Sequence, residues 1–327
     1  MKRSSPSHVT STTSLYVGID VGGTKTLAVV GDNAGRVIGR AVNPSRAGQT
    51  AEVIVDVIVH TAHQAVATAG VQPEVITAAG IASAGAVDPR RGVLVSCPQM
   101  PQISDAPLVS MFLERWNIPT VIGNDANLAG LAEQRFGAGK GVKNLLFITI
   151  STGIGGGIIL NGEVYTGATG FAGEVGHMTI DTHGPYGRSP TPGSWESHCS
   201  GVALARITNE RIASGERSML EARGESLDAV AIFDALRVGD ALAMSVVEDA
   251  IDHMGAALAS VVNILGPEVI VIGGGLSNEW AAYIAPSIER MRGITFADVG
   301  KRTLVVPPAL GIEAGAIGAI ALAAGKG

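Results

Sequence analysis

The sequence contains very few cysteines. Only Cys97 and Cys199 occur among its 327 residues. Two cysteines are too few for a disulfide framework or for a zinc site made of several thiolates. Such low cysteine usage is typical of proteins that work in a reducing compartment, and we therefore expect a cytoplasmic protein.

The chain also lacks a long apolar run. A membrane-spanning helix needs about 20 nearly uninterrupted apolar residues. The run from Val269 to Ile272 is short, and the one from Ile312 to Ala324 is interrupted by Glu313. Residues 1–14 are polar and lack the apolar core of a secretory signal. We expect no membrane partner and interpret residues 1–14 as a disordered tail.

Clusters of basic residues are missing as well. The formal net charge is -6, and no group of Lys and Arg side chains stands out along the chain. A nucleic-acid surface needs a basic patch to bind phosphates, so we expect no nucleic-acid partner. An anionic ligand would have to be bound largely by backbone amides.

The composition is that of a folded protein with two related halves. Hydrophobic residues make up 46% and charged residues 16%, which excludes disorder over most of the chain. Residues 15–42 and 144–167 follow one plan, in which three short apolar strands are joined by glycine-rich turns. Between them, helical and strand patterns alternate, which favours parallel pairing. Two duplicated units are expected to face each other across a ligand-binding cleft.

Three glycine-rich segments could hold phosphate groups. DVGGTKT at 20–26 and STGIGGG at 151–157 occupy matching places in the two repeats, and IGGGL at 272–276 follows a buried strand and is expected to precede a helix. Bare backbone amides can bind a polyphosphate. Each segment alone could equally be a tight turn or a site of close packing, but two matching loops favour a clamp on a polyphosphate.

Two further motifs carry acidic residues. GNDAN at 123–127 follows a strand and precedes a helix, so Asn124 or Asp125 could cap that helix, and Asp125 could also deprotonate an attacking hydroxyl. GEVGH at 173–177 supplies Glu174 and His177, and Glu196 lies farther along. These three side chains could bind a polyhydroxylated ligand or could belong to a solvated loop.

With these motifs in this order, the chain resembles the ROK family (repressor, open reading frame, kinase), which comprises sugar kinases of the actin/hexokinase-like ATPase superfamily. The match covers about Leu15 to Ala324 and includes WESHCSG, PEVIVIGGGL and PALGIEAGAIGA. It implies an α/β fold with two duplicated domains around a central cleft. We expect a domain of residues 15–122, onto which 307–327 packs, and a domain of residues 123–306.

The resemblance also implies transfer of the ATP γ-phosphate to a sugar hydroxyl, commonly the 6-hydroxyl of a hexose. Asp125 matches the catalytic base. Sugar-binding positions are matched by Gly85, Asn124, Asp125, Glu174, His177 and Glu196. ATP-binding positions are matched by Asp20, Gly22, Gly23, Thr24, Lys25, Ser151, Thr152, Gly153, Gly155, Gly273, Gly274, Gly275 and Leu276. Asp20 is expected near Mg²⁺, through water, and the family resemblance favours a homodimer or homotetramer.

One departure from the family pattern concerns zinc. The usual motif CxCGxxGC follows the histidine matched by His177, but its cysteine positions align here with Gly187, Ser189 and Ser194. Although His183 and His198 lie nearby, three histidines at this spacing are a poor substitute for three thiolates and a histidine. We therefore expect no zinc site.

Substrate identity stays open at this point. Ala84 and Gln99 stand where the family often has proline and asparagine, on the expected sugar side. An N-acetylhexosamine kinase or a glucokinase that uses polyphosphate is an alternative. A sugar sensor without catalysis is an alternative from another class. Repressors of the family carry a winged helix-turn-helix, for which residues 1–14 are too short.

Overall fold

Two five-stranded sheets with the same plan form the frame of the protein. The computed structural model describes residues 14–187 and 191–325. The first sheet has the order β3 (Val37–Pro44), β2 (Lys25–Asp32), β1 (Leu15–Val21), β4 (Ile76–Ser83) and β8 (Thr120–Asn124). The second has the order β11 (Glu163–Val164), β10 (Ile154–Leu160), β9 (Leu145–Ile150), β12 (Val269–Gly273) and β13 (Leu304–Val306). In each sheet three antiparallel strands are followed by two parallel ones, which confirms the predicted duplication.

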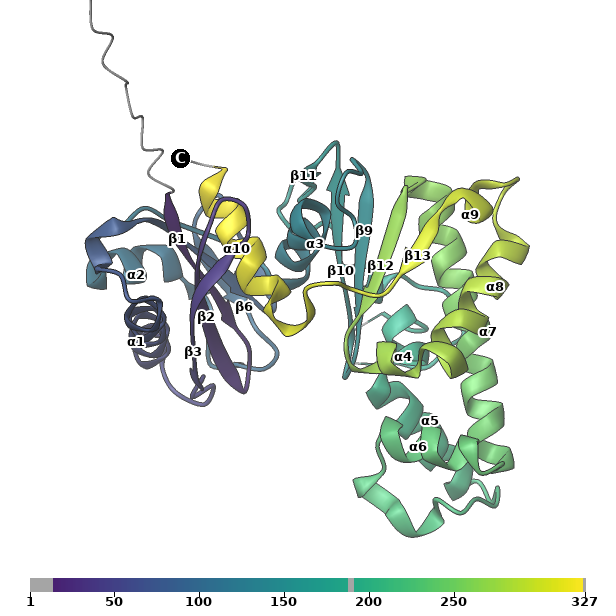
Figure 1. Ribbon diagram of the computed structural model, residues 1–327. Helices are drawn as coiled ribbons and strands as arrows, with labels where there is room; N and C mark the ends of the chain where they lie inside the picture. Colours follow the sequence, from purple (N-terminus) through teal and green to yellow (C-terminus); the bar gives the residue numbers. More distant parts are fainter. Residues whose placement is uncertain (1–13, 188–190, 326–327) are drawn as a thin grey trace, which may run out of the picture.

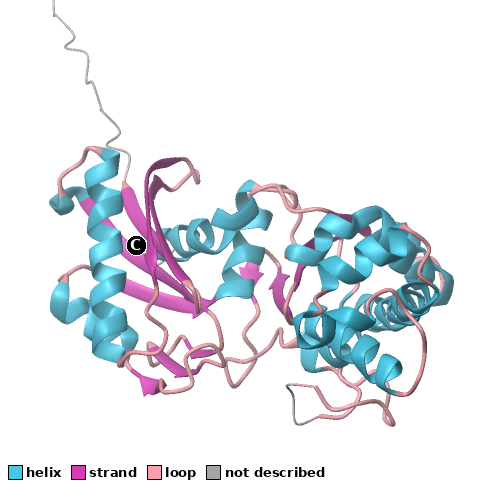
Figure 2. Ribbon diagram, turned by 90° about the horizontal axis from the view of Figure 1, so that it is seen from below, coloured by secondary structure: helices cyan, strands magenta, loops and turns pink. Residues whose placement is uncertain are grey.

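Helices cover both sheets and also fill the space between them (Figure 1). The outer face of the first sheet is covered by α1 (Ala51–Ala69) and α2 (Leu108–Arg115). Between the sheets lie α3 (Asp125–Phe136) and α10 (Ala314–Ala324), which pack on each other. Beyond the second sheet are α4 (Trp195–Cys199), α5 (Gly201–Ala213), α6 (Ala229–Arg237), α7 (Ala241–Leu265), α8 (Ala285–Ile294) and α9 (Val299–Arg302). Figure 2 shows the same layers from below.

Alternation along β9 explains how the second sheet is held between two helical layers. Leu146 and Ile148 belong to the core formed with α5 to α8, whereas Leu145 and Phe147 belong to the core formed with α3. Successive strand residues point to opposite faces of a sheet. Because both faces are buried, the strand is an almost continuous apolar run rather than an alternating one.

The helix α10 approaches the first sheet unusually closely. Its residues are mostly Ala, Gly and Ile, and it packs against β1 and β4. At Gly80 in β4, a Cβ atom would collide with the carbonyl oxygen of Ala319. Glycine is therefore required at this crossing. The segment 307–325 returns in this way to the first sheet, and we propose the boundary after residue 122 as the division between two domains.

Two local features of the structure differ from what the sequence indicates. A small sheet of β5 (Ala86–Asp88), β6 (Val93–Ser96) and β7 (Ser104–Ala106) was not predicted, because its strands are too short to show a period. The helix expected after IGGGL is present, but it does not begin as an α-helix. A 3-10 turn at Gly275–Glu279 and a π turn at Trp280–Ile284 come first, and α8 begins at Ala285. Consecutive glycines disfavour helix formation there.

Within the described part of the chain, no helix combines the length and the apolar character that crossing a bilayer requires.

Candidate active site

Asp125 lies where β8 ends and α3 begins. Asn124 is the N-cap of α3, since its Oδ1 accepts a hydrogen bond of 3.1 Å from the Asn127 amide. Its Nδ2 donates to the Gly85 carbonyl oxygen at 3.1 Å. Of the two candidates for the cap, Asn124 therefore has this role. Asp125, whose Oδ1 accepts from the Ala126 amide at 2.8 Å, lies in the first turn of the helix.

Gly85 is held in a conformation that favours glycine. Its φ is 93°, and a Cβ atom there would collide with the carbonyl oxygen of Ser96. Positive φ values of this kind are strained for residues with a side chain. The hydrogen bond from Asn124 thus joins the turn after β4 to the start of α3, which places Gly85 beside the acidic end of that helix.

Asp20 is the second-last residue of β1, near the same edge of the sheet as Asn124. The strands β1, β4 and β8 are parallel neighbours, so their carboxyl ends meet at one edge. The pKa of Asp20 is raised to about 7, chiefly by burial and then by the negative charge of Asp125, while Lys25 acts in the opposite direction. The first turn of α10 also reaches this carboxylate, because a Cβ atom on Gly315 would lie 2.8 Å from Asp20 Oδ2.

The first glycine loop is a tight turn between β1 and β2. The Gly22 amide donates to the Lys25 carbonyl at 3.1 Å, and the Ser45 amide donates to the Thr24 carbonyl at 3.1 Å. The side chains of Thr24 and Lys25 are exposed. Gln99 packs on this loop, since a Cβ atom on Gly23 would lie 2.5 Å from the Gln99 Cβ. Gln99, expected on the sugar side, thus contacts the first glycine loop.

The second glycine loop and the IGGG segment lie side by side. The turn between β9 and β10 is closed by a hydrogen bond of 2.8 Å from the Ser151 amide to the Gly153 carbonyl. Gly274 has a φ of 86°, and a Cβ atom there would collide with the carbonyl oxygen of Ile150. The two predicted nucleotide segments therefore form one continuous backbone surface. Ser151 and Thr152 are exposed on it, whereas the Leu276 side chain is buried in the core.

Glu196 connects this surface with the acidic residues. It lies in α4, and its Oε2 accepts a hydrogen bond of 2.9 Å from the Ile154 amide at the start of β10. Its other oxygen, Oε1, is left for a ligand. The sequence marked Glu196 as a possible ligand, but nothing in it indicated the contact with Ile154.

Three carboxylates share one electrostatic environment. Burial raises the pKa of Glu174, the positive charge of His177 lowers it, and the charges of Asp125 and Glu196 raise it further. Burial also raises the pKa of Asp125, although the hydrogen bond from Ala126 acts in the opposite direction. The Glu174 Oε2 and His177 Nε2 atoms are 3.8 Å apart, and both side chains are about half exposed.

The region of the absent cysteines is only partly described. Ser194 is buried and caps α4, accepting from the Ser197 amide at 3.3 Å. Gly187 packs on Ser197, while Ser189 lies outside the described residues. His183 is exposed. Neither described position offers a thiolate, but the helix that carries Glu196 is held at this point by a hydroxyl cap.

Comparisons with known proteins agree with one another. The model of the ROK family matches residues 16–326. A glucokinase from Halalkalibacterium halodurans is 32% identical, and the aligned region covers 93% of each chain. The crystal structure of a ROK family glucokinase from Streptomyces griseus in complex with glucose and AMPPNP is 31% identical, with a TM-score of 0.77, over 96% of this chain and 100% of that one. A xylose repressor from Bacillus subtilis is 26% identical, over 92% of this chain and 75% of the repressor.

Proposed function

The chain belongs to the ROK family, and we propose on that basis that it is an ATP-dependent sugar kinase, which transfers the γ-phosphate of ATP to a hexose hydroxyl. The observation that carries the proposal is the meeting of Asp125, Glu174 and Glu196 beside two adjoining glycine-rich segments. The acidic group suits a polyhydroxylated acceptor, and the backbone surface suits a polyphosphate. The likeness to a glucokinase with glucose and an ATP analogue supports this pairing.

Asp125 is proposed as the general base. A base is most effective when its pKa lies near the working pH, and burial raises the pKa of Asp125 toward that range. The carboxylate takes the proton of the attacking hydroxyl, the hydroxyl oxygen forms a bond to the γ-phosphorus, and ADP leaves with the electrons of the broken P–O bond. Phosphoryl transfer depends mainly on positioning and on neutralising charge.

Glu174, Glu196, His177, Asn124 and the Gly85 backbone are proposed to bind the sugar. Carboxylates accept hydrogen bonds from hydroxyl groups, and those bonds are stronger than bonds between neutral groups. Glu196 still has Oε1 to offer, and the Asn124 side chain, which bonds to Gly85 and Asn127, also interacts with the Asp125 carboxylate. The same residues thereby orient the sugar and maintain the local fold.

The residues around Asp20 fit a magnesium ion. Mg²⁺ prefers oxygen ligands, keeps several waters and is often held by one or two carboxylates together with substrate phosphates. Asp20 offers such a carboxylate, and its pKa of about 7 shows that Lys25 does not compensate for burial and for the charge of Asp125. When bound, the ion would neutralise charge on the phosphates. We propose that Asp20 holds it through water, beside the loop of residues 22–25.

A coupled ADP-release assay with Mg²⁺ and ATP tests the proposal. The acceptor panel contains glucose, mannose, galactose, xylose, N-acetylglucosamine and N-acetylmannosamine, and a parallel series replaces ATP with polyphosphate. We expect ADP release that depends on at least one hexose. The 6-deoxy analogue of that hexose should inhibit without being phosphorylated, because it lacks the accepting hydroxyl.

Two results would contradict parts of this account. Phosphorylation of the 6-deoxy analogue would show that another hydroxyl accepts the phosphate. If no sugar promoted ADP release while calorimetry still detected sugar binding, the chain would be a sensor without catalysis, a function consistent with its similarity to a xylose repressor.

A further inference from the structure

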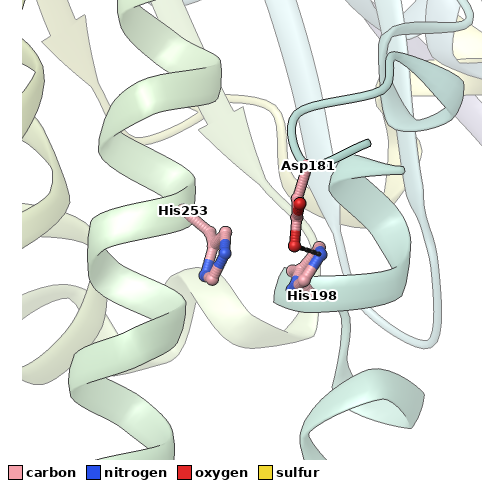
Figure 3. Close-up of side chains that lie close together, drawn as sticks. All are labelled: Asp181, His198 and His253. Carbon is pink, nitrogen blue, oxygen red and sulfur yellow. Dashed lines mark ion pairs between the residues drawn. The ribbon is translucent and has the colours of Figure 1, made fainter. Parts of the chain in front are cut away.

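Three potential metal ligands lie together outside the proposed active site. They are Asp181, in the loop after His177; His198, in α4; and His253, in α7 (Figure 3). One ligand atom from each residue lies within 4.8 Å of the other two. The three come from segments that are far apart in the sequence, so chain proximity does not explain their meeting.

His198 has an unusual environment for a polar side chain. It is only 7% exposed, and within the described residues its buried Nε2 atom has no hydrogen-bond partner. The nearest carboxylate oxygen, Asp181 Oδ2, is 3.9 Å away, which is too far for a hydrogen bond. A buried polar atom without a partner costs free energy, and such atoms are rare in folded proteins. The unpaired His198 Nε2 atom therefore indicates that a ligand binds between it and Asp181 Oδ2.

Hydrogen bonds orient the other two ligands. Asp181 Oδ1 accepts from the His183 amide at 2.9 Å, which turns Oδ2 toward His198. His253 Nδ1 lies 2.7 Å from the carbonyl oxygen of Asp249. Because a carbonyl can only accept, Nδ1 carries the proton, and Nε2 keeps a free lone pair. Histidines that bind metals commonly donate their second nitrogen to a carbonyl or carboxylate in this way.

We propose that Asp181, His198 and His253 bind a divalent transition-metal cation of the Zn²⁺ type. Two imidazoles and one carboxylate form a donor set that suits Zn²⁺ and disfavours Mg²⁺ and Ca²⁺, which prefer oxygen ligands. Ligand atoms in a tetrahedral zinc site are about 3.3 Å apart, so no two of the three donors, which lie within 4.8 Å of one another, must approach by more than roughly 1.5 Å. The imidazole rings stack with centroids 4.0 Å apart, so metal binding requires the half-buried His253 ring to rotate, and the bond from its Nδ1 to the Asp249 carbonyl has to adjust with it. Water completes the coordination.

This site uses none of the positions of the missing cysteines. The expectation of no zinc site rests on the three cysteine positions and on the spacing of nearby histidines, and His253 of α7 is too distant in the sequence to enter it. An ion at the new site would link the loop at Asp181 to α4 and α7. Because α4 also carries Glu196, the ion would fix the helix that presents this proposed sugar ligand. The inference itself does not depend on kinase activity, since it can be tested by binding alone.

Titration with Co²⁺, followed by competition with Zn²⁺, tests the site directly. We expect one Co²⁺ per chain, a visible absorption band typical of four ligands, and displacement by Zn²⁺ but not by Mg²⁺. Zn²⁺ should also raise the thermal unfolding midpoint, because it binds the folded chain only. Binding that is absent, or that has no fixed stoichiometry, would overturn the proposal.

Variants locate the bound ion. His253 is half buried on a long helix, so His253→Ala should fold, and circular dichroism in EDTA verifies this. We expect the affinity of His253→Ala for Zn²⁺ to fall at least a hundredfold, because loss of an outer partner alone costs tenfold to a hundredfold. Asp181→Asn should also weaken binding. His183→Ala, at an exposed neighbouring histidine, is the matched control. Equal affinities of His253→Ala and the wild type, or lost binding in the control, would refute the assignment.

Discussion

Replacing Asp20 with Asn should stabilise the protein while impairing its proposed activity. In the folded chain the pKa of Asp20 is raised from 3.8 to about 7 by burial and by the charge of Asp125. Between these values the folded chain holds a proton that the unfolded chain has released, so the contribution of Asp20 to stability falls as the pH rises from about 4 to about 7. Asn removes that penalty and keeps the size of the side chain.

The expected magnitude follows from the two pKa values. At about 1.4 kcal/mol per pKa unit, the free energy of unfolding of Asp20→Asn should exceed that of the wild type by roughly 2 kcal/mol near pH 5 and by on the order of 4 kcal/mol near pH 8. Urea unfolding in EDTA, without nucleotide, measures the difference between the two proteins at each pH. Such a gain would mean that the wild type sacrifices stability to keep an ionised carboxylate at this place.

Asp240→Asn is the matched control, with the opposite sign. Burial alone would raise the pKa of Asp240, but hydrogen bonds from the Ala243 and Met219 amides outweigh it and hold the pKa below its usual value. Its contribution is present at neutral pH and is lost as the pH falls through the lowered pKa, so Asp240→Asn should be less stable than the wild type near neutrality. If the advantage of Asp20→Asn did not grow with pH, the reasoning about Asp20 would be refuted.

Two further substitutions test the packing and the sugar site. Glu133→Ala should lower the free energy of unfolding by roughly 3 kcal/mol, because each amide left without a partner costs about 1 kcal/mol or more. The buried Glu133 carboxylate accepts hydrogen bonds from the Ala138, Ala309 and Leu310 amides. A loss under about 1 kcal/mol in urea unfolding would contradict this. Glu174→Gln should raise the KM for the sugar about tenfold or more and leave kcat nearly unchanged, because a hydrogen bond to a charged acceptor contributes about 1.5–3 kcal/mol to binding. Steady-state kinetics that show an unchanged KM would exclude Glu174 from sugar binding.

Much of the fold is predictable because local and global signals agree. The runs at 15–21 and 145–150 are apolar, rich in branched residues and followed by glycine turns, and both form central strands. The helical period of residues 50–69 predicts a helix, and α1 spans Ala51–Ala69 and ends at Gly70 with a φ of 70°. Periodicity, turn residues and caps all indicate the same boundaries there. The repetition of one plan then made the duplicated sheets predictable.

The contacts that assemble the candidate active site and the proposed metal site were not predictable in this way. The bond from Ile154 to Glu196 and the stacking of His198 on His253 depend on how α4 and α7 pack on the second sheet. No local pattern encodes those distances. The sequence of the helix that carries His253 shows the apolar face of a core helix and no pattern of metal ligands. A resemblance can mark Glu196 as a ligand, but only the fold shows that one of its oxygens is already bonded.

The most direct test of the account is the turnover of Asp125→Asn, measured with the sugar identified in the acceptor panel. We predict that kcat falls at least a hundredfold, since general-base catalysis contributes about a hundredfold to ten-thousandfold, while calorimetry finds sugar and nucleotide affinities close to those of the wild type. Asp298→Asn, at an exposed carboxylate paired with Lys301, should retain full activity. A kcat of Asp125→Asn within about tenfold of the wild type would contradict the assignment of Asp125 as the base.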